Sequence, residues 1–225
     1  PGCYAIGEAN FSDHGANRLG ASALMQGLGD GYFVLPYTIG DYLADDIRTG
    51  PISTDSPEFE EAENDVKKQL EFFVNNNGTK SVDYFHKRLG KVMWNNVGMS
   101  RNEKGLKEAV SEIRAIRDAF WKEVRVPGEV NELNQELEKA SRVADFLELG
   151  ELFAMDALNR NESCGGHFRE ESVEVGGEQD GEALRDDKNF AFVSAWEYTG
   201  NIAESKLHKE ELKYENIELK QRSYK

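Results

Sequence analysis

The chain has 225 residues, and its 42 acidic side chains outnumber its 27 basic ones, which gives a formal net charge of -15. Such a surplus of negative charge repels phosphate backbones and anionic lipid, so neither nucleic acid nor a bare membrane surface is an expected partner. The longest apolar stretch, residues 32–39, contains a proline and is far shorter than the ~20 apolar residues that span a bilayer. We therefore expect a folded protein without direct membrane insertion.

The first 50 residues are rich in glycine, with nine of the chain's 21 glycines. This density indicates backbone that lies close to another group. Residues 1–7 contain no initiator methionine and are typical of a turn followed by a short strand, which predicts that the chain is a fragment of a longer protein. The two cysteines make no disulfide framework, a usage typical of a reducing compartment.

A local motif, His14-Gly15-Ala16-Asn17-Arg18-Leu19-Gly20, precedes a helical stretch at residues 21–28. Arg18 is a cation among mostly acidic neighbours. Its planar guanidinium suits bidentate binding of a carboxylate, and the glycines allow ligands to approach the backbone. The alternative is an arginine at a helix start that pairs with Asp13 or Asp30.

Residues 53–160 predict an antiparallel helical bundle. A linker ends at Ser56, a predicted N-cap, and Pro57 is a predicted first helical residue. Apolar residues then recur at spacings of three and four, as in the core face of a helix. The four predicted core faces are Phe59, Ala62, Val66, Leu70 and Phe73; Phe85, Leu89, Val92 and Met93; Leu106, Ala109, Ile113, Ile116 and Phe120; and Val130, Leu133, Leu137, Ala140, Ala144 and Leu147. Short breaks make successive helices neighbours.

The remaining residues, 161–225, predict an irregular region with short strands. Residues 162–190 hold nine acids and three bases around several glycines, which is typical of a solvated connection. Residues 190–196 form a predicted strand, and the last twenty residues are expected to lie extended on the surface. Cys164 and His167 have metal-like spacing, but no further ligands accompany them, so no metal site is predicted.

The segment Gly2-Cys3-Tyr4-Ala5-Ile6-Gly7-Glu8, followed by the His14–Gly20 motif, resembles the flavoprotein subunit of succinate dehydrogenase and fumarate reductase. Two further segments are similar to that family. Met93, Gly98 and Arg101 resemble its Met-x4-Gly-x2-Arg pattern, and residues 162–169 resemble its Glu-Ser-Arg-Gly-x-His-x-Arg segment, with Cys164 in place of the arginine.

This resemblance implies a mainly α fold: a bundle of three long helices, similar to a spectrin repeat, after the last strand and helix of an FAD-binding α/β domain. Residues 1–52 would end the FAD-binding domain, residues 53–160 would form the bundle, and residues 161–225 would be an irregular region packed on both.

The resemblance also implies roles for five residues. Arg18 would bind a carboxylate of succinate or fumarate, and Glu8 would accept hydrogen bonds from the FAD ribose. Ala23 and Leu24 would approach the flavin through backbone groups. The family usually has Asn-Ser-Leu at 22–24, so a family side-chain contact at Ala23 is not expected. His14 is a possible residue at the flavin face, or a structural hydrogen-bond donor.

The implied enzyme transfers a hydride between succinate and FAD and passes electrons to an iron-sulfur subunit, which a quinone-binding anchor holds at the inner face of the cell membrane in the cytoplasm. Other catalytic residues of the family lie upstream of this segment, so the fragment alone is predicted to be inactive. One alternative is an L-aspartate oxidase, which shares the His14–Leu19 segment. The other is a helical scaffold that docks a partner subunit without a ligand.

Overall fold

The computed structural model describes residues 4–10, 14–18, 20–216 and 218. The chain divides into two compact units, Pro1–Glu61 and Ala62–Lys225. The three-part division predicted above stays a prediction.

The first unit is a short turn followed by a run of helices. It contains the 3-10 turn η1 (Gly7–Ala9), α1 (Ser22–Gly29), the π-helical η3 (Asp30–Val34), α2 (Leu35–Tyr37), η4 (Thr38–Tyr42) and α3 (Ala44–Ile47). Residues 4–6 form no strand, so the strand predicted before Gly7 is wrong. These residues find no strand to pair with in the part of the chain that the structure describes, and a strand needs such a partner for its backbone groups.

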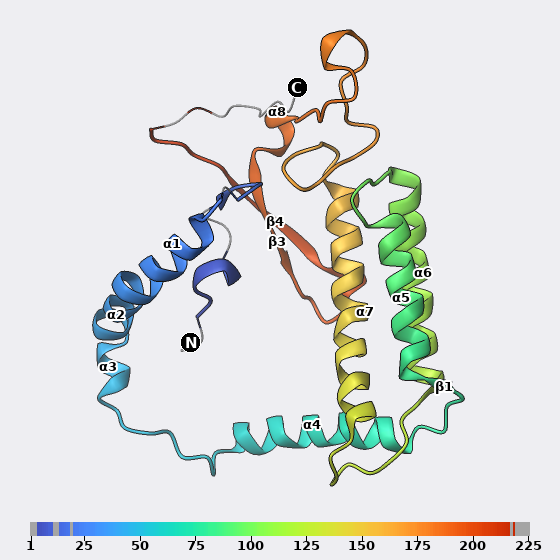
Figure 1. The fold of residues 1–225 in the computed structure, drawn as a ribbon. Coiled ribbons are helices and arrows are strands. Elements are labelled where there is room, and N and C mark those ends of the chain that lie inside the picture. The colour runs from blue at the N-terminus through green and yellow to red at the C-terminus, as the bar shows by residue number, and fades with distance from the viewer. Residues whose placement is uncertain (1–3, 11–13, 19, 217, 219–225) are drawn as a thin grey trace. The chain divides into compact units, whose positions relative to one another are not determined.

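The second unit is built on three long helices, α5 (Val82–Asn96), α6 (Glu103–Glu123) and α7 (Gln135–Asn159), which lie side by side in Figure 1. The helix α4 (Pro57–Asn75) begins in the first unit and crosses one end of the three. A short parallel pair, β1 (Lys80–Ser81) with β2 (Val124–Arg125), closes the same end. The mainly α fold with three long helices is confirmed.

The core of the bundle follows the predicted faces of α5 and α6. Every predicted face residue of α6 is fully buried, and Phe85, Leu89 and Val92 of α5 are at most 4% exposed. The aromatic ring of Phe120 packs edge-on against Phe85 and Phe73. These contacts fix α4, α5 and α6 against one another.

The predicted face of α4 is wrong in its first half. Phe73 is fully buried, but Phe59 and Val66 are 47% and 56% exposed. Only the last turns of α4 reach the bundle, where the ring of Phe73 stacks on Trp121. The periodicity marks one face along the whole of α4. Because α4 crosses the end of the bundle, only the last turns of that face are covered by other helices.

The start of α7 also differs from the prediction. The predicted face includes Val130 and Leu133, but α7 begins only at Gln135, and Leu133 is 97% exposed. The reason is Asn134, whose Oδ1 accepts from the Leu137 N–H at 3.1 Å while its Nδ2 donates to the Pro127 carbonyl at 2.9 Å. This side chain ends the preceding turn and caps the helix at once.

We expect Asn134→Ala to lower the free energy of unfolding by about 1–2 kcal/mol, because it removes both the cap and the bond that closes the turn. Urea denaturation followed by helical circular dichroism would measure the loss. Asn95→Ala, at an exposed position of α5, is the matched control. Equal stabilities of the two variants would contradict the role of the cap.

The last part of the chain forms a hairpin beside α7. The strand β3 (Phe192–Glu197) pairs antiparallel with β4 (Lys206–Glu211), and α8 (Asp187–Phe190) and the 3-10 turn η6 (Ile202–Glu204) flank them. Trp196 Nε1 donates to Asp156 Oδ1 of α7 at 2.9 Å. The strand predicted at 190–196 is confirmed from Phe192 onward, and residues 206–211 pair in a sheet where only an extended surface segment was predicted.

Among the described residues, no helix combines the length and apolarity needed to cross a membrane.

Candidate functional site

The predicted ligand-binding residues lie in the first unit. Arg18 Nε is 4.0 Å from Glu8 Oε1, and the two side chains are 43% and 76% exposed. An ion pair this exposed contributes little to stability. It leaves a carboxylate and a guanidinium accessible next to each other. Of the two partners suggested for Arg18 in a purely structural role, Asp13 lies outside the described residues.

Asp30, the other suggested partner, holds the turn at Glu8 in place. Its Oδ2 accepts a hydrogen bond from the Gly7 N–H at 2.7 Å, which ties η1 to the end of α1. Gly7 has a φ of 63°, and a Cβ at this position would lie 3.3 Å from the Gly27 Cα. Glycine is therefore required here both by the left-handed backbone and by the close approach to α1.

The start of α1 offers backbone donors. Ala21 precedes the helix with a φ of 63°, and the first helical bond runs from Met25 N to Ala21 O at 3.3 Å. The N–H groups of Ala23 and Leu24 thus lie in the first turn, where a helix supplies no acceptors of its own. The positive end of the helix dipole adds to their attraction for an electron-rich group.

His14, the possible flavin-face residue, has a buried ring nitrogen. Its Nε2 has no hydrogen-bond partner within the described part of the chain. Buried polar atoms are nearly always paired, so such an atom calls for an explanation.

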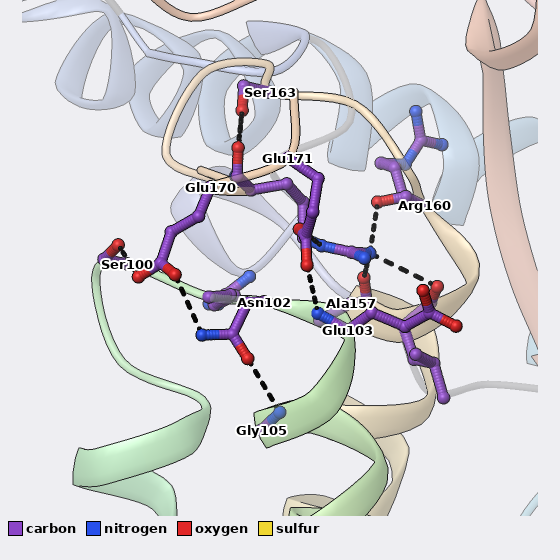
Figure 2. A network of polar contacts seen from close by, with 12 residues as sticks. Ser100, Asn102, Glu103, Gly105, Ala157, Arg160, Ser163, Glu170 and Glu171 are labelled. Atoms are coloured by element: carbon purple, nitrogen blue, oxygen red, sulfur yellow. Dashed lines mark hydrogen bonds and ion pairs between the residues drawn. The ribbon is translucent and has the colours of Figure 1, made fainter. Parts of the chain in front are cut away.

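A second polar cluster joins the bundle to the segment at residues 162–171, and Figure 2 shows part of it. Arg169 is 2% exposed, and its guanidinium donates to the carbonyls of Ala157, Leu158 and Arg160 at 3.0, 3.4 and 3.3 Å. These are carbonyls at the end of α7, which have no intrahelical donors. Arg169 therefore caps this helix with a buried cation.

Arg101 caps α5 in the same way. Its Nε donates to the carbonyls of Val97 and Gly98 at 3.2 and 3.0 Å. Its backbone N–H donates to the Phe168 carbonyl at 3.1 Å, and its own carbonyl accepts from Glu170 N at 2.8 Å. The two motif segments around Arg101 and Arg169 thus pair directly with each other.

Two carboxylates hold the start of α6 to this segment. Glu170 accepts from Ser100 Oγ at 2.7 Å and from Asn102 Nδ2 at 2.9 Å, and Glu171 accepts from the Glu103 N–H at 2.6 Å (Figure 2). The hydrogen bond from Asn102, followed by that from Ser100, lowers the pKa of Glu170. The glutamate stays ionised and keeps its hold on the α5–α6 loop.

Burial of charge in this cluster corrects the prediction for the first part of residues 162–190, while residues 175–178, 180 and 181 are exposed as predicted. Glu162, Ser163 and Arg169 are at most 2% exposed, although the segment was expected to be solvated. Arg160 pairs with Glu162 at 2.8 Å and also donates to the carbonyls of Phe190 and Phe192. The charges are buried because they cap helix ends and strand edges.

No group of three or more His, Cys, Asp or Glu side chains suited to a metal ion occurs among the described residues.

The arrangement of the helices is that of a known fold. A solved structure described as a quinol-fumarate reductase with menaquinol molecules superposes on 96% of this chain with a TM-score of 0.75 and 22% sequence identity, and 35% of that structure's chain is covered.

Sequence comparison identifies the family. A family model described as "Fumarate reductase flavoprotein C-term" matches residues 86–224. The fumarate reductase flavoprotein subunit of Helicobacter pylori is 32% identical over 75% of this chain and 23% of its own length. The succinate dehydrogenase flavoprotein subunit of Bacillus subtilis is 28% identical over 75% of this chain and 28% of its own length. The chain belongs to the family of fumarate reductase and succinate dehydrogenase flavoprotein subunits, and the resemblance seen in its motifs is confirmed.

The chain covers only part of these relatives, and an L-aspartate oxidase is also similar to it. The chain spans less than a third of the two curated relatives named above, so the activity of a whole protein is a matter for proposal. An L-aspartate oxidase of Ralstonia nicotianae is also 30% identical over 74% of this chain. The family model is described for fumarate reductase, and the two named subunits, at 32% and 28%, are about as identical to this chain as the oxidase is.

Proposed function

We propose that this chain serves in an FAD-containing enzyme that interconverts succinate and fumarate. The observation that carries the proposal is the accessible Arg18 beside Glu8 in a chain of this family. A guanidinium is the side chain best suited to bind a carboxylate through two parallel hydrogen bonds. In this role Arg18 binds and orients one end of the dicarboxylate.

The residues present fit the cofactor. The Glu8 carboxylate, in the middle of the tight turn η1, is 76% exposed and can accept hydrogen bonds from ribose hydroxyls. The N–H groups of Ala23 and Leu24, in the first turn of α1, can donate to an electron-rich edge of the flavin. FAD, when bound, supplies the capacity to take or give a hydride. The buried Nε2 of His14 has no partner among the described residues, which is consistent with a ligand at this nitrogen.

Arg18 would act in two ways on the bound dicarboxylate. It neutralises one carboxylate, so the substrate can enter a site that excludes water without an unpaired charge. It also fixes the carbon chain relative to the cofactor, which lowers the entropic part of the barrier. We further propose that the chain alone is inactive, and that electrons leave through an iron-sulfur subunit that places the protein at the cytoplasmic face of the membrane.

The test is Arg18→Ala in the full-length flavoprotein. Losing a desolvated, charge-assisted contact should cost roughly 2–4 kcal/mol in transition-state terms, so kcat/KM for succinate should fall about 30- to 1000-fold. Flavin content, measured by absorbance, should stay unchanged because Arg18 is assigned to the substrate. Arg48→Ala, at an exposed position of the same unit, should keep full activity.

Each alternative gives a different result. A scaffold without a ligand predicts the same kcat/KM for Arg18→Ala and the parent protein, which would refute the proposal. An L-aspartate oxidase predicts turnover of L-aspartate in place of succinate by the parent protein, and that substrate is the second arm of the assay.

A further inference from the structure

A histidine lies between the caps of α5 and α7. His167 Nδ1 is 2.7 Å from Arg101 Nη1, and its Nε2 is 2.8 Å from the Arg160 carbonyl oxygen. The ring therefore touches the loop after α5 on one side and the residue after α7 on the other. It belongs to a hairpin at residues 164–167, in which the backbone groups of Cys164 and His167 donate to each other at 2.8 and 3.1 Å.

The two ring contacts define the protonation state. A guanidinium has only donors, so Nδ1 must accept from Arg101, and Nε2 must carry the hydrogen that is donated to the Arg160 carbonyl. Only the neutral ring with its proton on Nε2 can make both bonds. A second proton on Nδ1 would place a cation 2.7 Å from the Arg101 guanidinium.

We infer that His167 is an acid-sensitive latch, which holds the 164–167 hairpin to the α5–α6 loop when its ring is neutral and releases the hairpin when its ring is protonated.

The charges around the ring favour its neutral form over the protonated one. Arginines face it from three elements: Arg101 from the α5–α6 loop, Arg160 from the end of α7 and Arg169 from its own segment. The neighbouring carboxylates are directed at these cations, since Glu162 pairs with Arg160, Glu171 pairs with Arg169, and Asp156 on α7 attracts Arg101. Cys164, in the same hairpin, has its thiol pKa raised by burial and then by Glu162, so it is uncharged. An imidazolium would meet three cations.

The direction of the pH dependence follows from the ring's surroundings. Burial, followed by the repulsion from Arg101 and the other arginines, lowers the pKa of His167 below its ordinary value of 6.5, although its bond to the Arg160 carbonyl acts in the opposite direction. Above pH 6.5 the ring is neutral in both the closed and the opened hairpin, and the latch has its full strength. Below 6.5 the opened form binds the proton first, so opening becomes more favourable as the pH falls through the lowered pKa.

The release is local because other bonds are independent of this ring. Glu170 and Glu171 still hold Ser100, Asn102 and the Glu103 N–H, and the pKa of Glu170 is lowered by its hydrogen bonds. These carboxylates keep their charge while His167 titrates. The hairpin should therefore open before the α5–α6 loop separates from the segment.

Hydrogen–deuterium exchange in the full-length flavoprotein tests the latch. The amides of Cys164 and His167, bonded across the hairpin, are the reporters, and the Glu170 amide, bonded to the Arg101 carbonyl, is the internal reference. After correction for the intrinsic pH dependence of exchange, lowering the pH from about 7.5 to about 5.5 should speed the reporters up to about tenfold and leave the reference unchanged. Reporter protection that does not change with pH would overturn the inference.

Two variants assign the effect to this ring. His167→Gln cannot titrate, so its corrected exchange should not vary with pH. His86→Gln removes an exposed histidine that touches Phe146 elsewhere on the bundle, and it should keep the full response. An equal response in His167→Gln and the parent would overturn the inference. If His167→Gln does not fold, Arg101→Met serves instead: without a donor to Nδ1, the reporters should already exchange faster at pH 7.5, and unchanged protection would count against the latch.

Discussion

Replacement of Arg169 by leucine is expected to lower the free energy of unfolding by about 3–5 kcal/mol, because it removes one partner of a buried, charge-bearing network. Leucine leaves the carbonyls of Ala157 and Leu158 without the Arg169 donor, while the Arg160 carbonyl keeps its bond from His167. Each unpaired buried carbonyl costs about 1–3 kcal/mol before relaxation. The Glu171 carboxylate, 3.2 Å from Arg169 Nε, loses its ion pair as well. Urea denaturation followed by circular dichroism measures the change.

Arg142→Leu is the matched control for this prediction. Arg142 lies on α7, the helix that Arg169 caps; its side chain is 67% exposed and pairs with Glu138 on the surface. Exposed pairs of this kind contribute about 0–1 kcal/mol, so the control should be close to the parent protein. If the two leucine variants lose equal stability, Arg169 is not the cap of α7.

The helices could be predicted from the sequence because their pattern is local. The face of α6 from Leu106 to Phe120 is buried at every predicted position, since a spacing of three and four residues describes a single rigid element. The errors fall at the ends of helices. Leu133 fits the periodicity of α7 but is excluded from it by the Asn134 cap, and a hydrophobic period contains no information about caps.

Burial that depends on a distant partner could not be predicted in the same way. The exposed Phe59 and Val66 continue the apolar face of α4 beyond the bundle. The periodicity of α4 contains no information about which part of that face other helices cover. Trp94, a large aromatic side chain on α5, is 85% exposed. Apolar character alone does not tell a core residue from one at an uncovered surface.

The polar cluster was found only in part. The resemblance identified Arg101 and residues 162–169 as separate motifs. It did not predict that they touch, because Arg101 and His167 are 66 positions apart in the sequence. Charge density suggested a solvated connection, whereas the charges cap helix ends. The spacing of Gly98 and Arg101 after the last apolar residue of α5 was the available signal, since cations favour a helix C-terminus. The roles of Glu8, His14, Arg18, Ala23 and Leu24 stay predictions.

A second large effect is expected at Glu151, a fully buried glutamate in the middle of α7. Its two oxygens pair with Arg114 Nε at 2.6 Å and with Arg117, both on α6, and the side chains of these arginines are 40% and 18% exposed. Glu151→Leu keeps the volume but leaves the mostly buried Arg117 without its counter-charge. Breaking one partner of such a network costs about 3–5 kcal/mol, and urea denaturation should measure a loss in this range.

The same electrostatic argument predicts that removing all three charges restores stability. Replacing Glu151 by leucine together with Arg114 and Arg117 by methionine removes every charge of the network and fills its volume with apolar atoms. Because the desolvation of three charges offsets much of their attraction, this triple variant should regain most of the stability that the single variant loses. Glu148→Leu, at an exposed position of α7, should change stability by no more than about 0.5 kcal/mol. A triple variant less stable than Glu151→Leu would mean that α6 and α7 need the ion pairs themselves and not merely the absence of an unpaired charge.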